Sequence, residues 1–131
     1  MKRELTTQQL KKKLWKIFSE YIRRSHADWQ GMVTCVTCGK YMHWKEADAG
    51  HYHPRTDGLA MFFEEKNVHP QCNPCNRWRH GNLTKYALYL RKRYGEQILE
   101  ELEWKQKQGT EIKYLDYLRL IEFYKNKLLE L

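Results

Sequence analysis

The chain has 131 residues, about the length of one domain, with 41% hydrophobic and 31% charged residues. No run approaches the roughly 18 consecutive apolar residues of a membrane-spanning helix, and the first residues lack the apolar core of a signal peptide. We therefore expect a single domain in a reducing cytoplasm, without membrane contact. In that compartment the four cysteines favour metal ligation over disulfides.

The net charge of +8 is concentrated near the N-terminus. Residues 1–24 carry eight basic and two acidic side chains, whereas residues 25–81 carry six of each. Residues 82–131 carry ten basic and eight acidic side chains. Such a basic patch is typical of nucleic-acid binding, but a solvated helix face has the same composition, so the charge alone leaves both interpretations open.

Residues 1–28 are predicted to form a basic N-terminal helix. Thr6 and Gln9 have the spacing of a capping box, and apolar residues recur at helical spacing from Leu10 onward. The candidates on this helix for contacts to DNA phosphates are Lys11, Lys12 and Lys13.

Residues 31–81 have a different composition. The short runs MVTCV, YMHW, GHYH and LAMFF alternate with Gly, Pro and Asp, which is typical of β-hairpins and tight turns. We therefore expect a small β-rich unit in this part of the chain.

Residues 82–131 return to a helical pattern. Helices are predicted to start near Thr84, Glu96 and Thr110, and Gly95 and Gly109 are predicted to end the first two. The last helix is expected to bury one side, formed by Tyr114, Leu118, Ile121 and Leu128. The predicted fold is α+β and mostly helical, in one domain spanning residues 1–131. It places the β-rich unit of residues 31–81 between the N-terminal helix and the C-terminal helices.

Two CxxC pairs, Cys35–Cys38 and Cys72–Cys75, are separated by 33 residues. Each pair can bind one zinc through a tight knuckle, and together they provide four thiolates for a closed tetrahedral site with Zn–S distances near ~2.3 Å. A closed site has no open coordination position, so we expect a structural zinc. Redox-active thiols are the alternative. Two tryptophans are expected to pack in the core around this centre, Trp44 and Trp78.

The segment after the second CxxC pair indicates a second centre. Asn73 and Pro74 are typical of a helix N-cap and of a first helical position. A helix from Pro74 to about His80 places Asn76 and His80 at i and i+4 on one face. Both side chains can ligate a divalent metal there. For His80 the alternative is an interaction with the C-terminal end of its own helix.

His51 and His53 lie in the stretch DAGHYH, where alternation along an extended strand places both histidines on one side. A neutral imidazole near pH 7 can take the proton of an attacking water. Each histidine also has a structural interpretation, for His51 as a buried, hydrogen-bonded side chain of a small zinc domain. The nearest carboxylate, Asp48, is either a metal ligand or a turn residue.

The order of these residues resembles a known nuclease motif. His51, Asn67 and Asn76, the last directly after a CxxC pair, resemble the ββα-metal (HNH) nuclease motif. The stretches AGHY, NVHPQCNPCN and the following G-N-x-x-x-Y resemble more narrowly the NinG (Rap) family of lambdoid phages, the recombination endonucleases, over roughly residues 35–104. The chain is also similar, more distantly, to the phage recombination endonuclease VII, which has the same zinc-bracketed layout.

The resemblance implies a role for each residue of the motif. It implies that His51 is the general base, that Asn67 fixes a loop by hydrogen bonds, and that Asn76 is a metal ligand. Many HNH enzymes have Asp or His directly before the base as the other metal ligand, whereas this chain has Gly50 there. The candidates that remain for this second ligand are Asp48, His53 and His80.

The resemblance further implies a metal-dependent DNA endonuclease of phage or prophage recombination, in the cytoplasm of a bacterial host, that cuts branched DNA of the Holliday-junction type. One Mg²⁺ or Mn²⁺ can stabilise the leaving oxygen and orient the phosphate. Two symmetric cuts in a four-way junction predict a homodimer, with the first and last helices as its interface. The arginines expected to contact neighbouring phosphates are Arg55, Arg77 and Arg79.

Two other functions remain open on the sequence. One is a zinc-stabilised DNA-binding or assembly module without cleavage, and Gly50, where a metal ligand is expected, is the argument for it. The other is an HNH nicking nuclease without preference for a DNA structure. Cleavage of a four-way junction compared with linear duplex separates them.

Overall fold

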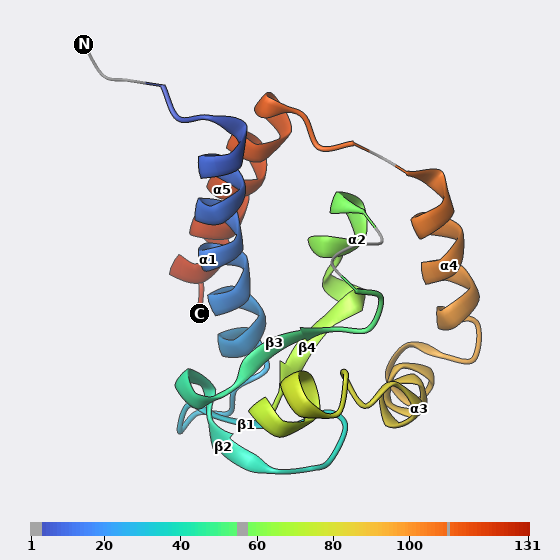
Figure 1. The fold of residues 1–131 in the computed structure, drawn as a ribbon. Coiled ribbons are helices and arrows are strands. Elements are labelled where there is room, and N and C mark those ends of the chain that lie inside the picture. The colour runs from blue at the N-terminus through green and yellow to red at the C-terminus, as the bar shows by residue number, and fades with distance from the viewer. Residues whose placement is uncertain (1–3, 55–57, 110) are drawn as a thin grey trace.

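The structure is a computed structural model that describes residues 4–54, 58–109 and 111–131 (Figure 1). The helices and strands are α1 (Thr7–Ser25), β1 (Met32–Thr34), β2 (Tyr41–His43), β3 (Asp48–His51), α2 (Leu59–Phe62), β4 (Val68–Gln71), α3 (Leu83–Tyr94), α4 (Ile98–Gln108) and α5 (Tyr114–Leu129). Among the described residues, the short helical turns are of 3-10 type at Trp44–Glu46 and Glu65–Asn67 and of π type at Pro74–Trp78. The fold is α+β and mostly helical, as predicted. None of the helices within the described ranges is long and apolar enough to cross a membrane.

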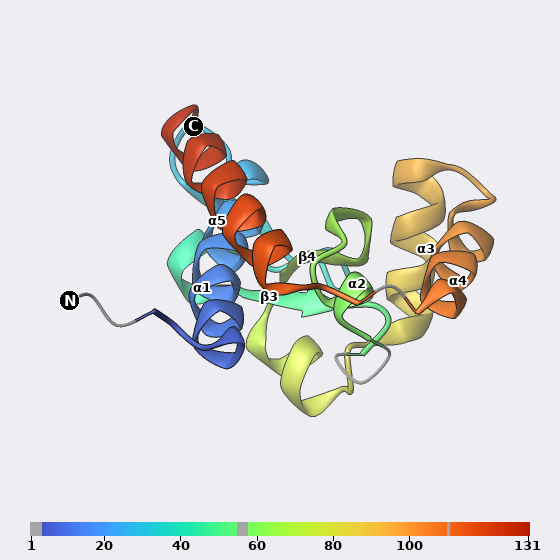
Figure 2. The same cartoon turned by 90° about the horizontal axis from the view of Figure 1, so that it is seen from above.

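Helices α1 and α5 lie side by side at one end of the molecule (Figures 1 and 2). The capping box that starts α1 is confirmed, because Gln9 N donates to Thr6 Oγ1 at 3.1 Å and Thr6 N donates to Gln9 Oε1 at 2.8 Å. The two helices bury one face each against Phe62 and Phe63. These faces consist of Leu10, Leu14, Phe18 and Ile22 on α1, and Tyr117, Ile121 and Tyr124 on α5.

Two predictions about the last helix are wrong in whole or in part. Helix α5 starts at Tyr114, because the Asp116 carboxylate accepts a hydrogen bond of 2.9 Å from Lys113 N and caps the helix there. The predicted start, Thr110, lies outside the described residues. The predicted buried face is only partly wrong: Ile121 is buried and Tyr114 packs against the core, as predicted, but Leu118 is 42% exposed, and Tyr117 and Tyr124 are buried instead.

The strands form two antiparallel pairs, which lie below and between the helices in the view of Figure 1. β1 pairs with β2, and β3 pairs with β4, so that Gly50 lies opposite His69 and His51 lies opposite Val68. The π-type turn at Pro74–Trp78 follows β4 directly. Two strands and a short helical turn therefore bring residues 48–51 close to residues 71–76.

The β-type interpretation of LAMFF is wrong, because Leu59–Phe62 form helix α2. A helical turn directs Met61 towards α3 and α4, and directs Phe62 and Phe63 towards α1 and α5. Consecutive apolar residues can all be buried in this way, whereas a strand would point alternate side chains to opposite faces.

Helices α3 and α4 lie on the other side of the strands from α1 and α5 (Figure 2). Gly95 and Gly109 end them, as predicted, with positive φ angles of 103° and 57°. Their shared core consists of Met61, Tyr86, Leu90, Ile98 and Leu102.

A buried hydrogen-bond chain joins α3 to the β3–β4 pair. His69, with no exposed surface, lies 2.7 Å through Nε2 from Tyr94 Oη and 3.0 Å through Nδ1 from Tyr86 Oη. Tyr86 in turn donates to Gly50 O at 2.7 Å. Because that donation uses the Tyr86 proton, His69 Nδ1 must be the donor to Tyr86. The neutral imidazole therefore supports the strand that carries His51.

Acid is expected to weaken this fold through His69. Burial, reinforced by His26 and Arg93, lowers the pKa of His69 from 6.5 to about 3. The unfolded chain takes up this proton near pH 6.5, whereas the folded chain takes it up only near pH 3. The free energy of unfolding is therefore unaffected by His69 above pH 6.5 and decreases as the pH falls from 6.5 towards 3. The thermal midpoint of His69→Gln should then fall less between pH 7.5 and 5 than that of wild type. Equal falls would contradict this account, and His43→Gln is the control.

Candidate functional site

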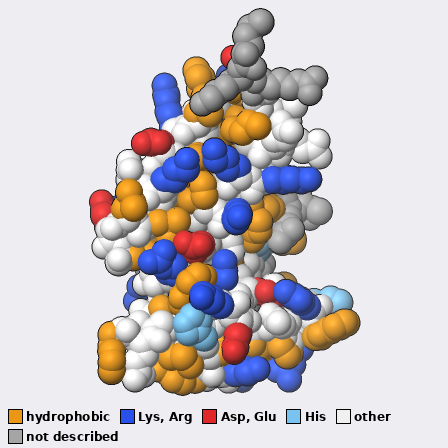
Figure 3. Space-filling model, turned by 90° about the vertical axis from the view of Figure 1, so that its left-hand side faces the viewer, with side chains coloured by type: hydrophobic (Ala, Val, Ile, Leu, Met, Phe, Trp, Pro, Cys, Tyr) orange, Lys and Arg blue, Asp and Glu red, His pale blue; other side chains and the backbone are white. Residues whose placement is uncertain are grey.

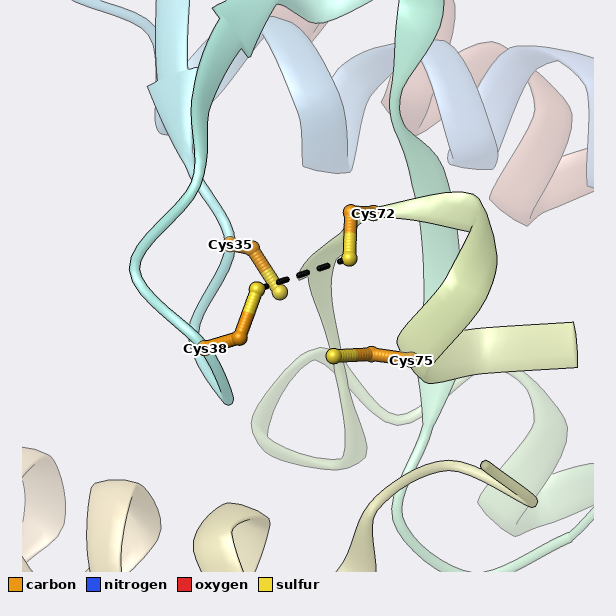
Figure 4. Close-up of side chains that lie close together, drawn as sticks. All are labelled: Cys35, Cys38, Cys72 and Cys75. Carbon is orange, nitrogen blue, oxygen red and sulfur yellow. Dashed lines mark hydrogen bonds between the residues drawn. The ribbon is translucent and has the colours of Figure 1, made fainter. Parts of the chain in front are cut away.

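The four cysteines come together at one point of the fold (Figure 4). Their sulfur atoms all lie within 4.8 Å of one another, and Cys38 Sγ is 3.5 Å from Cys72 Sγ. Tetrahedral zinc with Zn–S bonds near ~2.3 Å needs sulfurs a little under 4 Å apart, so this group could hold a zinc ion. No pair forms a disulfide.

The surroundings of two thiols, Cys35 and Cys75, favour the thiolate form, whereas burial raises the pKa of Cys38 and raises that of Cys72 to about 12. Burial alone would raise the pKa of Cys35, but hydrogen bonds from the Thr37 hydroxyl and from backbone amides outweigh it and lower this pKa to about 6. Arg79 Nη1 and Asn82 Nδ2 each lie 3.7 Å from Cys75 Sγ. These donors stabilise negative sulfur, the form that binds a metal.

The two tryptophans expected around this centre behave differently. Trp44 packs against the cysteine cluster, as predicted. Trp78 is 79% exposed, so its predicted core position is wrong. It is the last residue of the π-type turn, and its side chain lies in solvent.

The turn after Cys72 also differs from the predicted helix. Asn73 already has helical φ and ψ angles of −56° and −44° and makes no capping hydrogen bond, so it is not the predicted N-cap. The helical segment ends at Trp78, and His80 has a positive φ of 50°. His80 is therefore not on a common helix face with Asn76, although both reach the same cavity.

An open cavity of about 480 Å³, here called the central cavity, brings together part of the predicted site. The cavity is lined by Ala49, His51, Tyr52, Pro54, Asn76, His80, Gly81 and Leu83. Strand β3 supplies His51, and the π-type turn supplies Asn76. β3 ends at His51 and the chain bends at His53, so the expectation that both histidines lie on one side of a single strand is wrong.

His51 is held by contacts with Phe62 and Trp15. Its Nε2 lies 2.9 Å from Phe62 O, and its ring stacks on Trp15 of α1 with centroids 5.2 Å apart. The Phe62 ring lies 4.9 Å from the imidazole. A carbonyl oxygen only accepts, so Nε2 carries the proton and Nδ1 keeps its lone pair in the neutral ring.

Asn67 is fully buried and ties together the chain that follows His51. Its Oδ1 accepts from His53 N at 2.8 Å, and its Nδ2 donates to His53 O at 3.1 Å and to Met61 O at 2.9 Å. These hydrogen bonds use both ends of the amide to hold the backbone. The geometry gives Asn67 a positioning role.

Asp48 is surrounded by donors. Arg77 donates to both carboxylate oxygens at 2.9 Å, and Asn76 Nδ2 donates to one of them at 3.0 Å. When the side-chain amide of Asn73 is oriented with its nitrogen towards Asp48, that nitrogen donates to Asp48 Oδ1 at 3.1 Å and to Oδ2 at 3.2 Å. As a metal ligand Asp48 would have to give up Arg77, so the structure places it as the group that orients Asn76.

A second pocket of about 500 Å³, here called the basic pocket, adjoins the central cavity and shares Ala49 and Asn76 with it. Its remaining lining residues are Trp15, Ser19, Arg23, Lys45, Ala47, Asp48 and Arg77. Lys11, one of the predicted DNA contacts, lies 5.0 Å over the Phe62 ring, on the same face of α1 as Trp15. Lys and Arg side chains gather on the side of the molecule where α1 lies (Figure 3).

The other residues that were predicted to contact DNA do not lie together. Lys12 and Lys13 are exposed on α1, and Arg79 is exposed beside the cysteines. Arg55 lies outside the described residues. Sequence reasoning missed four side chains, because each comes near the site only through tertiary packing. Trp15, Arg23 and Lys45 line the basic pocket, and Gln71 faces Gly50.

Fold and site define a small α+β protein with a four-cysteine centre beside a cavity that carries His51 and Asn76. A family model described as "Bacteriophage Lambda NinG protein" matches residues 2–131, so the chain belongs to the NinG family. Proteins named "Protein ninG" from Escherichia phage 933W, Escherichia phage lambda and Salmonella phage P22 are each 35% identical to it over 71 residues. That match covers 54% of this chain and only 34–35% of the relatives. No solved structure matches.

Removal of one thiolate is expected to unfold the centre, because binding of a structural metal supplies folding free energy. Cys75→Ser should lose the bound zinc, measured by elemental analysis, and lose the cooperative thermal transition of wild type. Asn76→Ala, the next residue along the chain, is the matched control and should keep one zinc per chain. A Cys75→Ser protein that keeps a full equivalent of zinc would contradict the assignment.

Proposed function

We propose that this protein is a divalent-metal-dependent endodeoxyribonuclease that hydrolyses phosphodiesters in branched DNA during phage recombination. The observation that carries the proposal is the meeting of His51 and Asn76 in the central cavity, beside the basic pocket. An imidazole, a metal-binding oxygen and flanking cations are the groups that phosphodiester hydrolysis needs.

His51 is the proposed general base. The hydrogen bond to Phe62 O keeps the proton on Nε2, so Nδ1 can take the proton of a water that attacks phosphorus. Stacking on Trp15 fixes the plane of the ring, and the three hydrogen bonds of Asn67 fix the loop behind it. The chain thereby holds the base in one tautomer and one orientation.

The residues around Asn76 fit a hard divalent cation. Because Asp48 accepts from Asn76 Nδ2, the amide oxygen Oδ1 is turned away from Asp48 and towards Gly50. A neutral amide oxygen is a ligand that Mg²⁺ and Mn²⁺ accept, and a sparse protein site leaves positions for water and phosphate oxygens. When bound, the cation would neutralise charge on the phosphate and its leaving oxygen.

DNA binding is proposed for the side of the molecule that carries α1. Lys11 next to the central cavity and the cations of the basic pocket, Arg23, Lys45 and Arg77, can contact phosphates on either side of the scissile bond. Arg77 already makes a two-point contact with a carboxylate, and phosphate has similar geometry.

The preference for branched DNA is supported by the resemblance to the recombination endonucleases. Two symmetric cuts in a four-way junction require two active sites related by a two-fold axis, so we propose a homodimer. The inner faces of α1 and α5 are buried against each other within one chain, so only their outer faces are open to a second chain. The exposed apolar side chains on α5 include Leu115, Leu118 and Phe123.

A second candidate function is a DNA-binding module that does not cut. Gly50 favours it, since this position lacks the side chain that serves as a metal ligand in many HNH enzymes. Metal-dependent cleavage by purified protein would exclude this candidate.

Cleavage is expected to depend on His51 and Asn76. Wild type with Mg²⁺ or Mn²⁺ should cut a labelled four-way junction in preference to linear duplex, and EDTA should stop the reaction. His51→Ala should lower the rate about a hundredfold or more, because a positioned base contributes at least that much. Asn76→Ala should lose activity at the same metal concentration. Both rates are read from product bands on a gel.

His43→Ala is the matched control, because His43 lies on β2 and caps Lys45 N through Nδ1. It should cut at the wild-type rate. Normal cleavage by His51→Ala would show that the proposed base is wrong. Equal cutting of junction and duplex would leave a nuclease without the proposed structural preference.

The α1 face is expected to contribute to DNA affinity through phosphate contacts. Lys11→Ala should weaken junction binding and reduce the slope of log affinity against log salt by about one, as loss of one phosphate contact predicts. Fluorescence anisotropy at several salt concentrations measures both quantities. Lys107→Ala on α4 is the control and should leave the slope unchanged. An unchanged slope for Lys11→Ala would remove Lys11 from the interface.

A further inference from the structure

Gly50 is closely faced by the side chain of Gln71. A Cβ atom added to Gly50 would lie 1.8 Å from Gln71 Oε1, 2.7 Å from Gln71 Cδ and 3.1 Å from Asn76 Oδ1. No side chain fits at position 50 while Gln71 has this conformation. The space that a residue-50 side chain would enter is therefore taken by an amide oxygen from the opposite strand.

The orientation of the Gln71 amide is fixed by its nitrogen. Nε2 donates to Gly81 O at 2.8 Å and to Thr37 Oγ1 at 3.2 Å. The Thr37 hydroxyl lies 3.3 Å from Cys35 Sγ, so it can accept from Gln71 and donate its own proton to the sulfur. Because a carbonyl and a hydroxyl hold the nitrogen end, the oxygen end must point towards Gly50.

This oxygen has no hydrogen-bond partner. Within residues 4–54, 58–109 and 111–131, Gln71 Oε1 is the one buried side-chain nitrogen or oxygen left unpaired, and Gln71 has no exposed surface. An unpaired buried carbonyl of this kind is destabilising, because it has lost its hydrogen bonds to water without gaining others. A cation beside it would remove that destabilisation.

Two amide oxygens converge at this place. Asp48 holds the nitrogen of Asn76, as Gly81 and Thr37 hold the nitrogen of Gln71, so both oxygens face Gly50. Both lie within 3.1 Å of one point, the position of the absent Cβ. Mg²⁺ and Mn²⁺ take oxygen ligands at about 2.1 Å, so one ion could bind both with little side-chain movement.

We propose that Gln71, through Oε1, is the second protein ligand of the divalent cation, beside Asn76 Oδ1. It takes the place of the carboxylate or imidazole that Gly50 lacks. This inference rests on the proposed function, because it assigns a ligand to the same metal. Two neutral ligands without a carboxylate bind a cation weakly, so tight binding would require phosphate oxygens from DNA.

The test is direct binding of Mn²⁺ by zinc-loaded protein, measured by electron paramagnetic resonance of the free ion. Wild type should bind one weak equivalent. Gln71→Met, which keeps the size but removes the oxygen, should weaken binding about tenfold or more, and Gln71→Glu, which adds a negative oxygen, should strengthen it by a similar factor. Because the two changes act in opposite directions, loss of fold cannot account for both.

The controls separate failure of this inference from failure of the proposed function. Zinc content and thermal midpoint check the fold of each variant, and Gln108→Glu adds the same charge on exposed α4 and should change nothing. If Asn76→Ala weakens Mn²⁺ binding while both Gln71 variants bind as wild type does, Gln71 has only a structural role and the proposed metal site survives. If wild type binds no Mn²⁺ beyond its zinc, both proposals are overturned.

Discussion

The convergence of four cysteine sulfurs within 4.8 Å is the constraint on which the rest of the central unit depends. The loop between β1 and β2 carries two of these cysteines, and the segment directly after β4 carries the other two. The buried cluster at this centre is small and consists of Val33, Met42, Ala47, Cys35, Cys72 and Cys75. A cluster of this size stabilises little on its own, so a bound zinc would supply much of the free energy that holds these two segments together.

The same centre reaches the candidate active site through short covalent and hydrogen-bonded links. Asn76 follows Cys75 directly, so its position is fixed by the knuckle. Gln71 precedes Cys72 and is joined to the other knuckle through the Thr37 hydroxyl, which contacts Cys35 Sγ. The two proposed ligands of the second metal thus sit on the two sides of one zinc knuckle. Helix α1 closes the site from outside by stacking Trp15 on His51.

Local patterns in the sequence predicted the parts of the structure that depend on near neighbours. The CxxC spacing predicted the cysteine centre, Thr6 and Gln9 predicted the start of α1, and two glycines predicted the ends of α3 and α4. Features that depend on distant packing were not predictable in this way. The contact between Gly50 and Gln71 joins two strands, and the helical state of LAMFF follows from burial between two cores.

The central claim is that a cysteine-bound zinc holds a second, oxygen-ligated metal site beside His51. Anomalous diffraction from crystals grown with Mn²⁺, recorded at the zinc and manganese edges, tests it most directly. The account predicts a zinc peak among the four cysteine sulfurs and a separate manganese peak in contact with Asn76 Oδ1 and Gln71 Oε1. A manganese peak on Asp48 with Arg77 displaced, or zinc alone with no second peak, would contradict it.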